Sequence, residues 1–207
     1  MRRETQIDIG HRLLDMVRSG KPDMMDATFQ VDVDHYVSED QAAQERDVVF
    51  RHYPIIVAAS CELPEPGDFI TSEATGVPAL IVRNQDGAAR AFINVCRHRG
   101  SRVETERSGS KKRAFVCSYH GWSYDTDGNL KAIPQEFGFE GIDKSCHGLR
   151  ELPMVEKHGF IWARHAPGED FDLSDFTGGV EEDLDSFDIG NWHHFQTREI
   201  GCKMNWK

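Results

Sequence analysis

Two short stretches decide how this sequence is interpreted: Cys96-Arg97-His98-Arg99-Gly100 and Cys117-Ser118-Tyr119-His120-Gly121-Trp122. In each stretch a cysteine is followed by a histidine within three residues and then by a glycine, and eighteen residues separate His98 from Cys117. Each stretch follows a run with the composition of a strand. We therefore expect two neighbouring loops that offer two thiolates and two imidazoles to one site.

This donor set suits a mixed-ligand iron–sulfur cluster. Two thiolates would bind one iron and two neutral imidazoles the other, which removes negative charge and raises the reduction potential above that of an all-cysteine cluster. The predicted ligands are Cys96, His98, Cys117 and His120. The same residue types also suit a Cys2His2 zinc site, although a Cys-x-His half is unusual there. The iron–sulfur interpretation is favoured, and zinc remains the alternative.

Several residues are predicted to surround these ligands. The glycines lack a Cβ, so the backbone can turn sharply and bring N–H groups near the sulfurs. The arginines could screen cluster charge or meet a partner, although surface salt bridges would explain them equally well. A carboxylate such as Asp125 could accept the second N–H of a ligating histidine. The full set is Arg97, Arg99, Gly100, Tyr119, Gly121, Trp122 and Asp125. The remaining cysteines, Cys61, Cys146 and Cys202, are interpreted as plain buried thiols, and His193 and His194 as structural.

Short apolar runs separated by turn residues predict a mainly β domain. Asp86-Gly87 and Asp127-Gly128 are hairpin signals. The predicted strands cover 53–58, 79–83, 90–95, 114–117, 122–125, 129–133 and 159–163. We divide the chain into an N-terminal helical arm (1–50), the β domain (51–165) and an acidic C-terminal connector (166–207).

The two ends of the chain have their own patterns. Apolar residues between Ile9 and Val17 have helical spacing, and Gly20 ends that stretch. A second helix is expected to begin at Ser38, a good N-cap residue. Alternation between Trp192 and Trp206 suggests a strand of a following domain.

Composition excludes some classes of protein. The 24 basic and 35 acidic residues give a formal net charge of −11, which disfavours binding to nucleic acid. The apolar runs are too short to span a bilayer, and no apolar run follows Arg2 and Arg3 as a secretory signal requires. Five cysteines, an odd number, do not form a secreted disulfide framework. We expect a cytoplasmic protein.

The wording of the two motifs resembles the Rieske family, and specifically the N-terminal Rieske domain of ring-hydroxylating oxygenase large (α) subunits. Asn94-Val95, Ser123-Tyr124-Asp125 and Asn205-Trp206-Lys207 are similar to that family too, so the resemblance covers about residues 45–207. It implies a Rieske-type antiparallel β-sandwich with a short cluster-binding subdomain and one [2Fe–2S] cluster.

The resemblance also implies a role in electron transfer. Such subunits belong to NAD(P)H-dependent dioxygenase or monooxygenase systems, including those of aromatic hydrocarbon catabolism. A ferredoxin or flavin reductase would donate the electrons, and the full-length form could be a homotrimer, with or without β subunits. The rings of His98 and His120 would point outward and provide the exit.

Respiratory-type Rieske proteins differ at three positions. Ser101 and Tyr119 stand where those proteins carry a disulfide, and Trp122 stands where they carry a hydroxyl donor. Fewer hydrogen bonds to the sulfurs predict a potential toward the low end of the Rieske range of about −150 to +300 mV.

The family's second iron, held by two histidines and a carboxylate, has no matching site in this sequence. Asp8 with His11 and Asp32 with His35 offer only half of the spacing. We therefore expect the mononuclear Fe(II) in a C-terminal domain absent from this chain, which alone would transfer electrons and have no catalytic residues. A stand-alone Rieske ferredoxin is the alternative, disfavoured because 95 residues precede Cys96.

Overall fold

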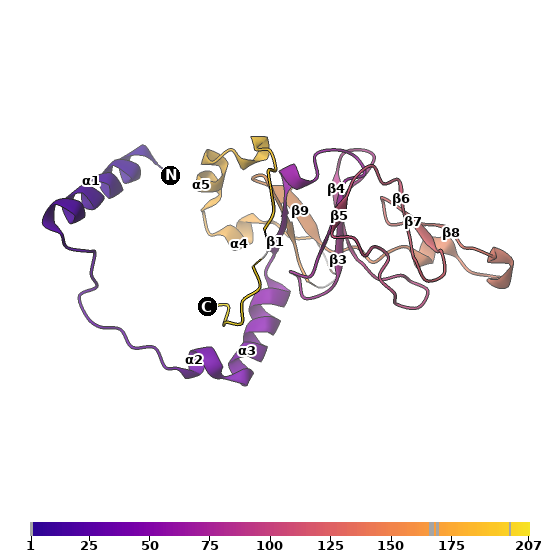
Figure 1. Cartoon of the computed structure of the whole chain (residues 1–207), viewed down its shortest axis with the longest axis horizontal. Coiled ribbons are helices and arrows are strands. Elements are labelled where there is room, and N and C mark those ends of the chain that lie inside the picture. Colours follow the sequence, from indigo (N-terminus) through magenta and orange to yellow (C-terminus); the bar gives the residue numbers. More distant parts are fainter. Residues whose placement is uncertain (1, 166–167, 169, 199) are drawn as a thin grey trace.

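The computed structural model describes residues 2–165, 168, 170–198 and 200–207. Its strands are short and form three antiparallel sheets, in the orders β1-β10-β9, β4-β3-β2-β5 and β6-β7-β8 (Figure 1). The strands are β1 (Ile55–Ala59), β2 (Phe69–Ser72), β3 (Ala79–Arg83), β4 (Ala89–Ile93), β5 (Ser108–Gly109), β6 (Ala114–Val116), β7 (Ser123–Asp125), β8 (Leu130–Ala132), β9 (Met154–Lys157) and β10 (Phe160–Ala163). The predicted mainly β, antiparallel fold is confirmed, and both hairpin signals lie at real hairpins, β3–β4 and β7–β8.

The central strand β3 divides the interior into two cores. Every residue of β3 is buried. Leu80 and Val82 join the core that also contains the two motif cysteines, whereas Ala79 and Ile81 join the core beneath β1 and β10. Successive side chains of a strand point to opposite faces, so one strand supplies both cores. The candidate site is thus built on one face of a fully packed sheet.

A partly buried ion pair ties this central sheet to the neighbouring one. The Arg83 guanidinium, at the end of β3, donates to both carboxylate oxygens of Glu156 on β9, at 2.5 and 2.8 Å. Arg83 Nε also donates to the carbonyl of Leu63 at 2.9 Å. These bonds fix the relative position of two sheets that share no strand pairing.

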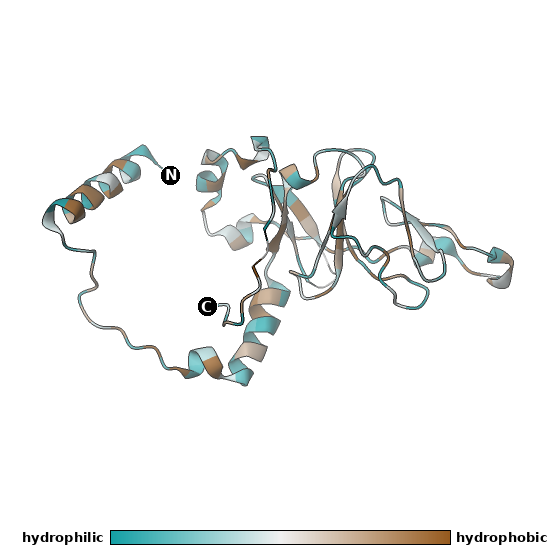
Figure 2. Cartoon of the chain, viewed as in Figure 1, coloured by the Kyte–Doolittle hydropathy of each residue, from teal (hydrophilic) through white to brown (hydrophobic). Residues whose placement is uncertain are grey.

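Helices occupy the N-terminal part, as predicted: α1 (Arg3–Ser19), α2 (Asp34–Val37) and α3 (Glu39–Glu45), followed by a π-helical turn (Arg46–Phe50). Gly20 ends α1 with φ 65°. The Ser38 hydroxyl caps α3 by accepting from the Gln41 amide at 3.3 Å. Helix α1 lies apart from the β domain in Figure 1, and its apolar residues, brown in Figure 2, are exposed: Ile7, Leu13, Leu14 and Val17.

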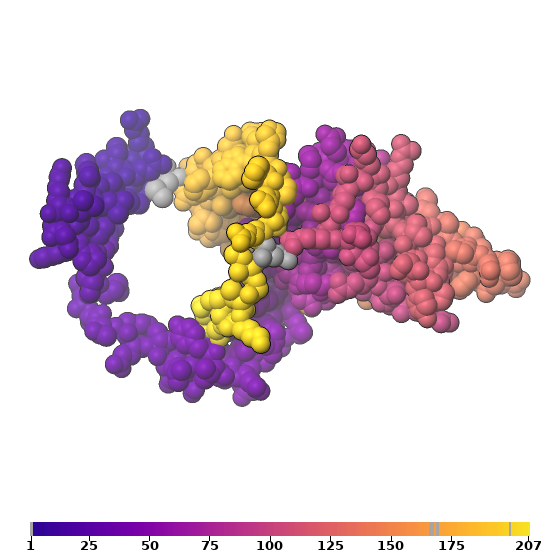
Figure 3. Space-filling view, in the orientation of Figure 1, coloured from indigo at the N-terminus to yellow at the C-terminus, as the bar shows by residue number. Residues whose placement is uncertain are grey.

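The C-terminal part contains α4 (Ser174–Thr177) and α5 (Glu181–Ser186). The strand expected between Trp192 and Trp206 is wrong: the described residues there form neither helix nor strand. Alternation alone makes no strand, because these residues have no neighbouring strand to pair with. The last residues instead reach the N-terminal helices (Figure 3), where Trp206 Nε1 donates to Glu45 at 2.8 Å and Lys207 Nζ to the same carboxylate at 2.6 Å.

The expected boundary between domain and connector, at 165/166, adjoins residues outside the described ranges, so the division of the chain remains a prediction. Among the described helices, none is both long and apolar enough to cross a membrane.

Candidate metal centre

The two cysteine-containing loops have the same backbone hydrogen bonds. The Gly100 amide donates to the Cys96 carbonyl at 3.0 Å, and the Gly121 amide donates to the Cys117 carbonyl at 2.9 Å. Each cysteine amide donates in turn to the carbonyl five residues ahead, at 2.7 Å in the first loop and 2.9 Å in the second. Two copies of one turn therefore present the two motifs.

The glycines make these turns possible. Gly100 has φ 75° and Gly121 has φ 73°, a left-handed conformation that is costly for residues with a Cβ. A Cβ on Gly121 would also lie 2.8 Å from Cγ of Pro134, whereas one on Gly100 would meet open space. Gly121 is required for both conformation and close packing.

The two thiols lie inside the protein. Cys96 is 3% exposed and Cys117 is 2% exposed, and both belong to the core that packs against β3. Burial raises the pKa of the Cys96 thiol, and the neighbouring Cys117 side chain raises it further, against the lowering effect of a hydrogen bond from Tyr124. The influence of Cys117 on this pKa indicates that the two sulfurs are close neighbours. Deprotonation of the Cys96 thiol in this environment calls for a compensating positive charge, such as a metal ion supplies.

The two imidazoles form a second pair nearer the surface. The ring centroids of His98 and His120 are 4.6 Å apart, with the rings inclined at 71°, and both residues are half-buried. Burial lowers the pKa of His98, and the charges of His120 and Arg99 lower it further. A lowered pKa keeps the imidazole neutral, which is the form that binds metals.

Aromatic side chains hold these rings in place. Trp122, 2% exposed, stacks on His98 with centroids 5.0 Å apart and planes within 6°. Tyr119 lies against His120 with centroids 3.8 Å apart, and Phe139 meets the His98 ring edge to face at 5.7 Å. Phe139 belongs to a segment that the sequence did not connect with the site.

Tyr124 was not singled out in the sequence as a site residue, yet its hydroxyl lies at the centre of the first loop. It is fully buried on β7, with its oxygen 3.3 Å from Sγ of Cys96, and it accepts a hydrogen bond from the Arg97 amide at 3.0 Å. Burial raises the pKa of Tyr124 far above its ordinary value, and the hydrogen bond with Cys96 adds to that effect, so the phenol stays protonated. Its O–H is therefore available to a thiolate sulfur.

The donor arrangement fits a two-iron cluster. In the described part of the chain, no three His, Cys, Asp or Glu side chains converge where one metal ion could sit. The four motif residues instead form a thiol pair and an imidazole pair, as two bridged irons require. Nδ1 of His98 is buried and has no hydrogen-bond partner among the described residues. A buried ring nitrogen without a partner is explained if it binds a metal.

Asp125, expected beside a ligating histidine, has its described contacts in the hairpin turn. Its carboxylate accepts from the amides of Asp127 at 3.0 Å and Asn129 at 2.8 Å, and Lys131 lies 3.6 Å away. These partners belong to the β7–β8 turn. Asp-Gly turns attract such side-chain caps, so the carboxylate stabilises the hairpin.

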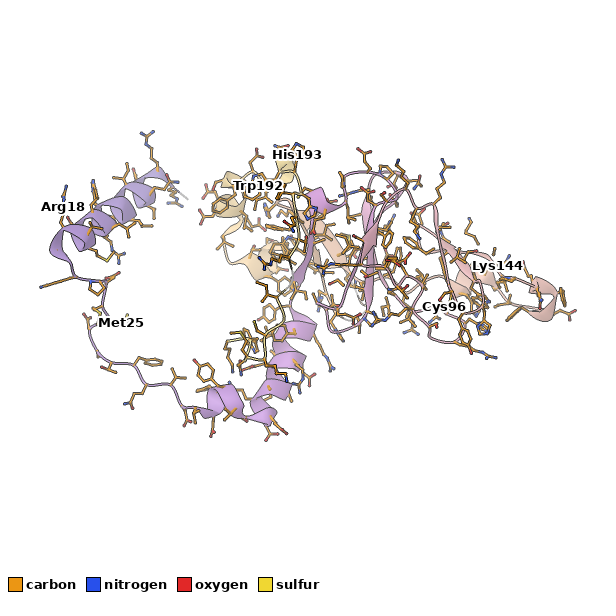
Figure 4. All side chains as sticks on the ribbon, viewed as in Figure 1. Arg18, Met25, Cys96, Lys144, Trp192 and His193 are labelled. Carbon is orange, nitrogen blue, oxygen red and sulfur yellow. The ribbon has the colours of Figure 1, made fainter. Side chains whose placement is uncertain are left out.

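The other cysteines are not buried as expected, because Cys61 is half-buried and Cys146 and Cys202 are exposed. Cys146 belongs to a turn near the site, and the ring centroid of the neighbouring His147 is 6.2 Å from that of Trp122. The Cys146 thiol donates to Asp143 at 3.4 Å. Cys96 is at the end of the molecule that carries β6 to β8, with Lys144 in the same region, whereas His193 and Trp192 lie far from it (Figure 4). The structure thus gathers only the motif residues and their aromatic neighbours.

Comparison with known proteins finds similar domains and proteins. Residues 53–143 match the model described as "Rieske [2Fe-2S] domain". The chain is 38% identical over 127 residues to the large oxygenase component of the naphthalene 1,2-dioxygenase system of Pseudomonas aeruginosa, covering 60% of this chain and 28% of that protein. It is 33% identical over 165 residues to the glycine betaine monooxygenase oxygenase subunit of Chromohalobacter salexigens, covering 80% of this chain and 36% of that protein.

Solved structures agree. The apo form of the quaternary ammonium Rieske monooxygenase CntA superimposes with a TM-score of 0.70 at 30% identity, over 78% of this chain and 46% of that one. The chain spans about a third of the length of the curated relatives described above. Residues 53–143 therefore match a Rieske [2Fe–2S] domain, and the chain is similar, in sequence and fold, to the Rieske part of Rieske oxygenase large subunits.

Proposed function

We propose that this chain transfers single electrons, and that Cys96, His98, Cys117 and His120 hold its [2Fe–2S] cluster. The observation that carries the proposal is that two buried thiols and two half-buried imidazoles occur in the same pair of loops. In addition, Nδ1 of His98 is buried and has no hydrogen-bond partner among the described residues. When bound, such a cluster supplies reversible one-electron chemistry.

The proposed cysteine and histidine ligands have different positions in the protein and different roles. The two cysteines anchor the site within the core, where water is excluded. The half-buried histidine rings form the side of the site nearest to solvent, and we infer that electrons enter and leave along them. Trp122 and Tyr119 restrict the rotation of these rings, so little rearrangement accompanies a change of charge.

We further propose that the chain is the electron inlet of an oxygenase large subunit. The relatives named above are components of a dioxygenase and a monooxygenase, and biphenyl 2,3-dioxygenase subunit alpha of Rhodococcus jostii is also similar, at 32% identity. On this basis the whole protein is an oxidoreductase of an NAD(P)H-dependent system, with its mononuclear iron in a further domain, a trimeric assembly and a cytoplasmic location.

The charge distribution supports an acidic electron donor. Residues 96–150, which carry the four proposed ligands, contain ten Lys and Arg against seven Asp and Glu, whereas the rest of the chain contains fourteen against twenty-eight. The site therefore lies in the basic part of an acidic protein. A ferredoxin with an acidic surface would be steered to this end of the molecule and repelled by the remainder.

The ligand assignment is tested by serine substitution. Cys96→Ser or Cys117→Ser should abolish or strongly alter the visible absorbance and the EPR signal of the reduced protein. Cys146→Ser, at an exposed cysteine outside the site, should leave both spectra unchanged. A Cys96→Ser variant with the wild-type spectrum, or loss of the cluster in Cys146→Ser alone, would contradict the assignment.

A further inference from the structure

The candidate site contains more unpartnered polar groups than one metal ligand explains. Among the described residues, six buried side-chain polar atoms have no hydrogen-bond partner, and three of them belong to the two loops: Nε of Arg97, Nδ1 of His98 and Nε1 of Trp122. Burying a polar group without a partner forfeits its hydrogen bonds to water, so native proteins rarely do it. Their concentration in the loops indicates that a bound group satisfies them.

Trp122 is held where it cannot find another partner. Its side chain is 2% exposed, its ring is stacked on His98, and Phe139 meets it edge to face at 5.7 Å. Rotation of the indole would break both contacts, and the burial of Nε1 excludes bulk water. An indole nitrogen is a donor only, so whatever satisfies it must be an acceptor.

The chain offers a contrast in Trp162. Its Nε1 donates to the carbonyl of Lys157 at 3.2 Å, within the β9–β10 hairpin. Away from the candidate site, therefore, a backbone carbonyl accepts the hydrogen bond of an indole N–H.

We propose that Nε1 of Trp122 donates a hydrogen bond to a sulfur of the [2Fe–2S] cluster. This inference rests on the proposed function, because it requires the cluster to be present. A donor to a cluster sulfur stabilises the reduced form, which carries more negative charge, and so raises the reduction potential. Trp122 stands where respiratory-type Rieske proteins carry a hydroxyl donor. On this proposal its indole N–H also donates a hydrogen bond.

The first test is a redox titration of Trp122→Phe, with Trp162→Phe as the matched control. Phenylalanine retains an aromatic ring against His98, and it removes the N–H donor together with the five-membered ring of the indole. We expect Trp122→Phe to retain the cluster spectrum and to titrate at a lower potential than the wild type, while Trp162→Phe titrates as the wild type does. A Trp122→Phe variant with an intact cluster and an unchanged potential would overturn the inference and leave the proposed function standing.

A second measurement decides the matter if Trp122→Phe does not fold. Replacing the indole at position 122 with benzothiophene keeps the ring size and removes the N–H. Exchange into heavy water should shift the Fe–S stretching bands in the resonance Raman spectrum of the wild type, and part of that shift should be missing from the benzothiophene variant. An identical shift in both proteins would overturn the inference. A wild-type protein without any Fe–S bands would overturn the proposed function as well.

Discussion

At the scale of single residues, the hydroxyl of Tyr124 is the group whose removal is most informative. Tyr124→Phe deletes the O–H beside Sγ of Cys96 and leaves the buried Arg97 amide without its acceptor. We expect a lower reduction potential, because one hydrogen bond to a ligand sulfur is lost, and a loss of about 1–3 kcal/mol in the free energy of unfolding.

Redox titration and denaturant unfolding would measure the two effects. Tyr53→Phe, at a half-exposed tyrosine packed on Phe176, is the control and should change neither quantity appreciably. An unchanged potential in Tyr124→Phe would show that this hydroxyl does not act on the cluster.

Tyr124 also shows what the sequence could not provide at this scale. The four proposed ligands are identifiable because their spacing is specific to a donor set. A tyrosine in an alternating strand is indistinguishable from an ordinary core residue until the strand pairing places its hydroxyl beside Cys96. Asp125 shows a further limit, since a carboxylate near a ligand motif can also cap the turn beside it, and the sequence does not tell the two roles apart.

At the scale of elements, the two loop glycines form a matched pair. Gly100→Ala places a Cβ in open space at φ 75°, and should cost about 1–2 kcal/mol for the left-handed conformation. Gly121→Ala has the same conformational cost, at φ 73°. It also brings its Cβ to 2.8 Å from the Pro134 ring, so it should be the more destabilising substitution. Midpoints of denaturant unfolding would rank them, and equal midpoints would contradict the packing argument.

The ion pair between β3 and β9 predicts a pH dependence. Burial alone would raise the pKa of Glu156, but the Arg83 guanidinium holds that pKa below its ordinary value of 4.5. Because the folded state binds the proton less readily than the unfolded state, the pair stabilises the fold above the ordinary pKa. That contribution is lost as the pH falls through the lowered pKa.

Glu156→Gln should therefore cost about 1.5–3 kcal/mol at neutral pH, and its stability should fall less on acidification than that of the wild type. Glu151→Gln is the control: its pairing with Arg90, at 3.2 Å, is exposed and should contribute less than about 1 kcal/mol. Unfolding curves at neutral and acidic pH would measure both. A Glu156→Gln protein with the wild-type pH profile would contradict this account.

Helices and strands were predictable from the sequence where their local pattern agrees with the partners they pack against in the fold. The strand at 79–83 was predicted because its buried, β-branched composition is unambiguous, and the helix from Ser38 because its cap is local. The structure of the alternating stretch at 192–206 was not predictable. A strand also needs a neighbouring strand to pair with, and alternation in the sequence does not indicate whether one is present.

At the scale of the whole molecule, the uneven charge predicts salt-dependent reduction. The rate at which an acidic ferredoxin reduces the protein should fall as ionic strength rises, because salt screens the attraction of the basic end. Stopped-flow reduction at increasing salt would measure it. A small neutral reductant serves as the control and should show no such dependence. Equal salt dependence for both reductants would contradict steering by this surface.

The central claim, a cluster held by two cysteines and two histidines, is tested most directly by pulsed EPR. The protein would be purified anaerobically with ¹⁵N-labelled histidine and reduced with dithionite. The account predicts a rhombic signal with an average g value below that of the free electron, coupled to two histidine nitrogens. Replacing His98 or His120 should remove the coupling of the replaced residue. A reduced protein without histidine coupling, or a colourless, EPR-silent protein that retains zinc after iron and sulfide reconstitution, would contradict it.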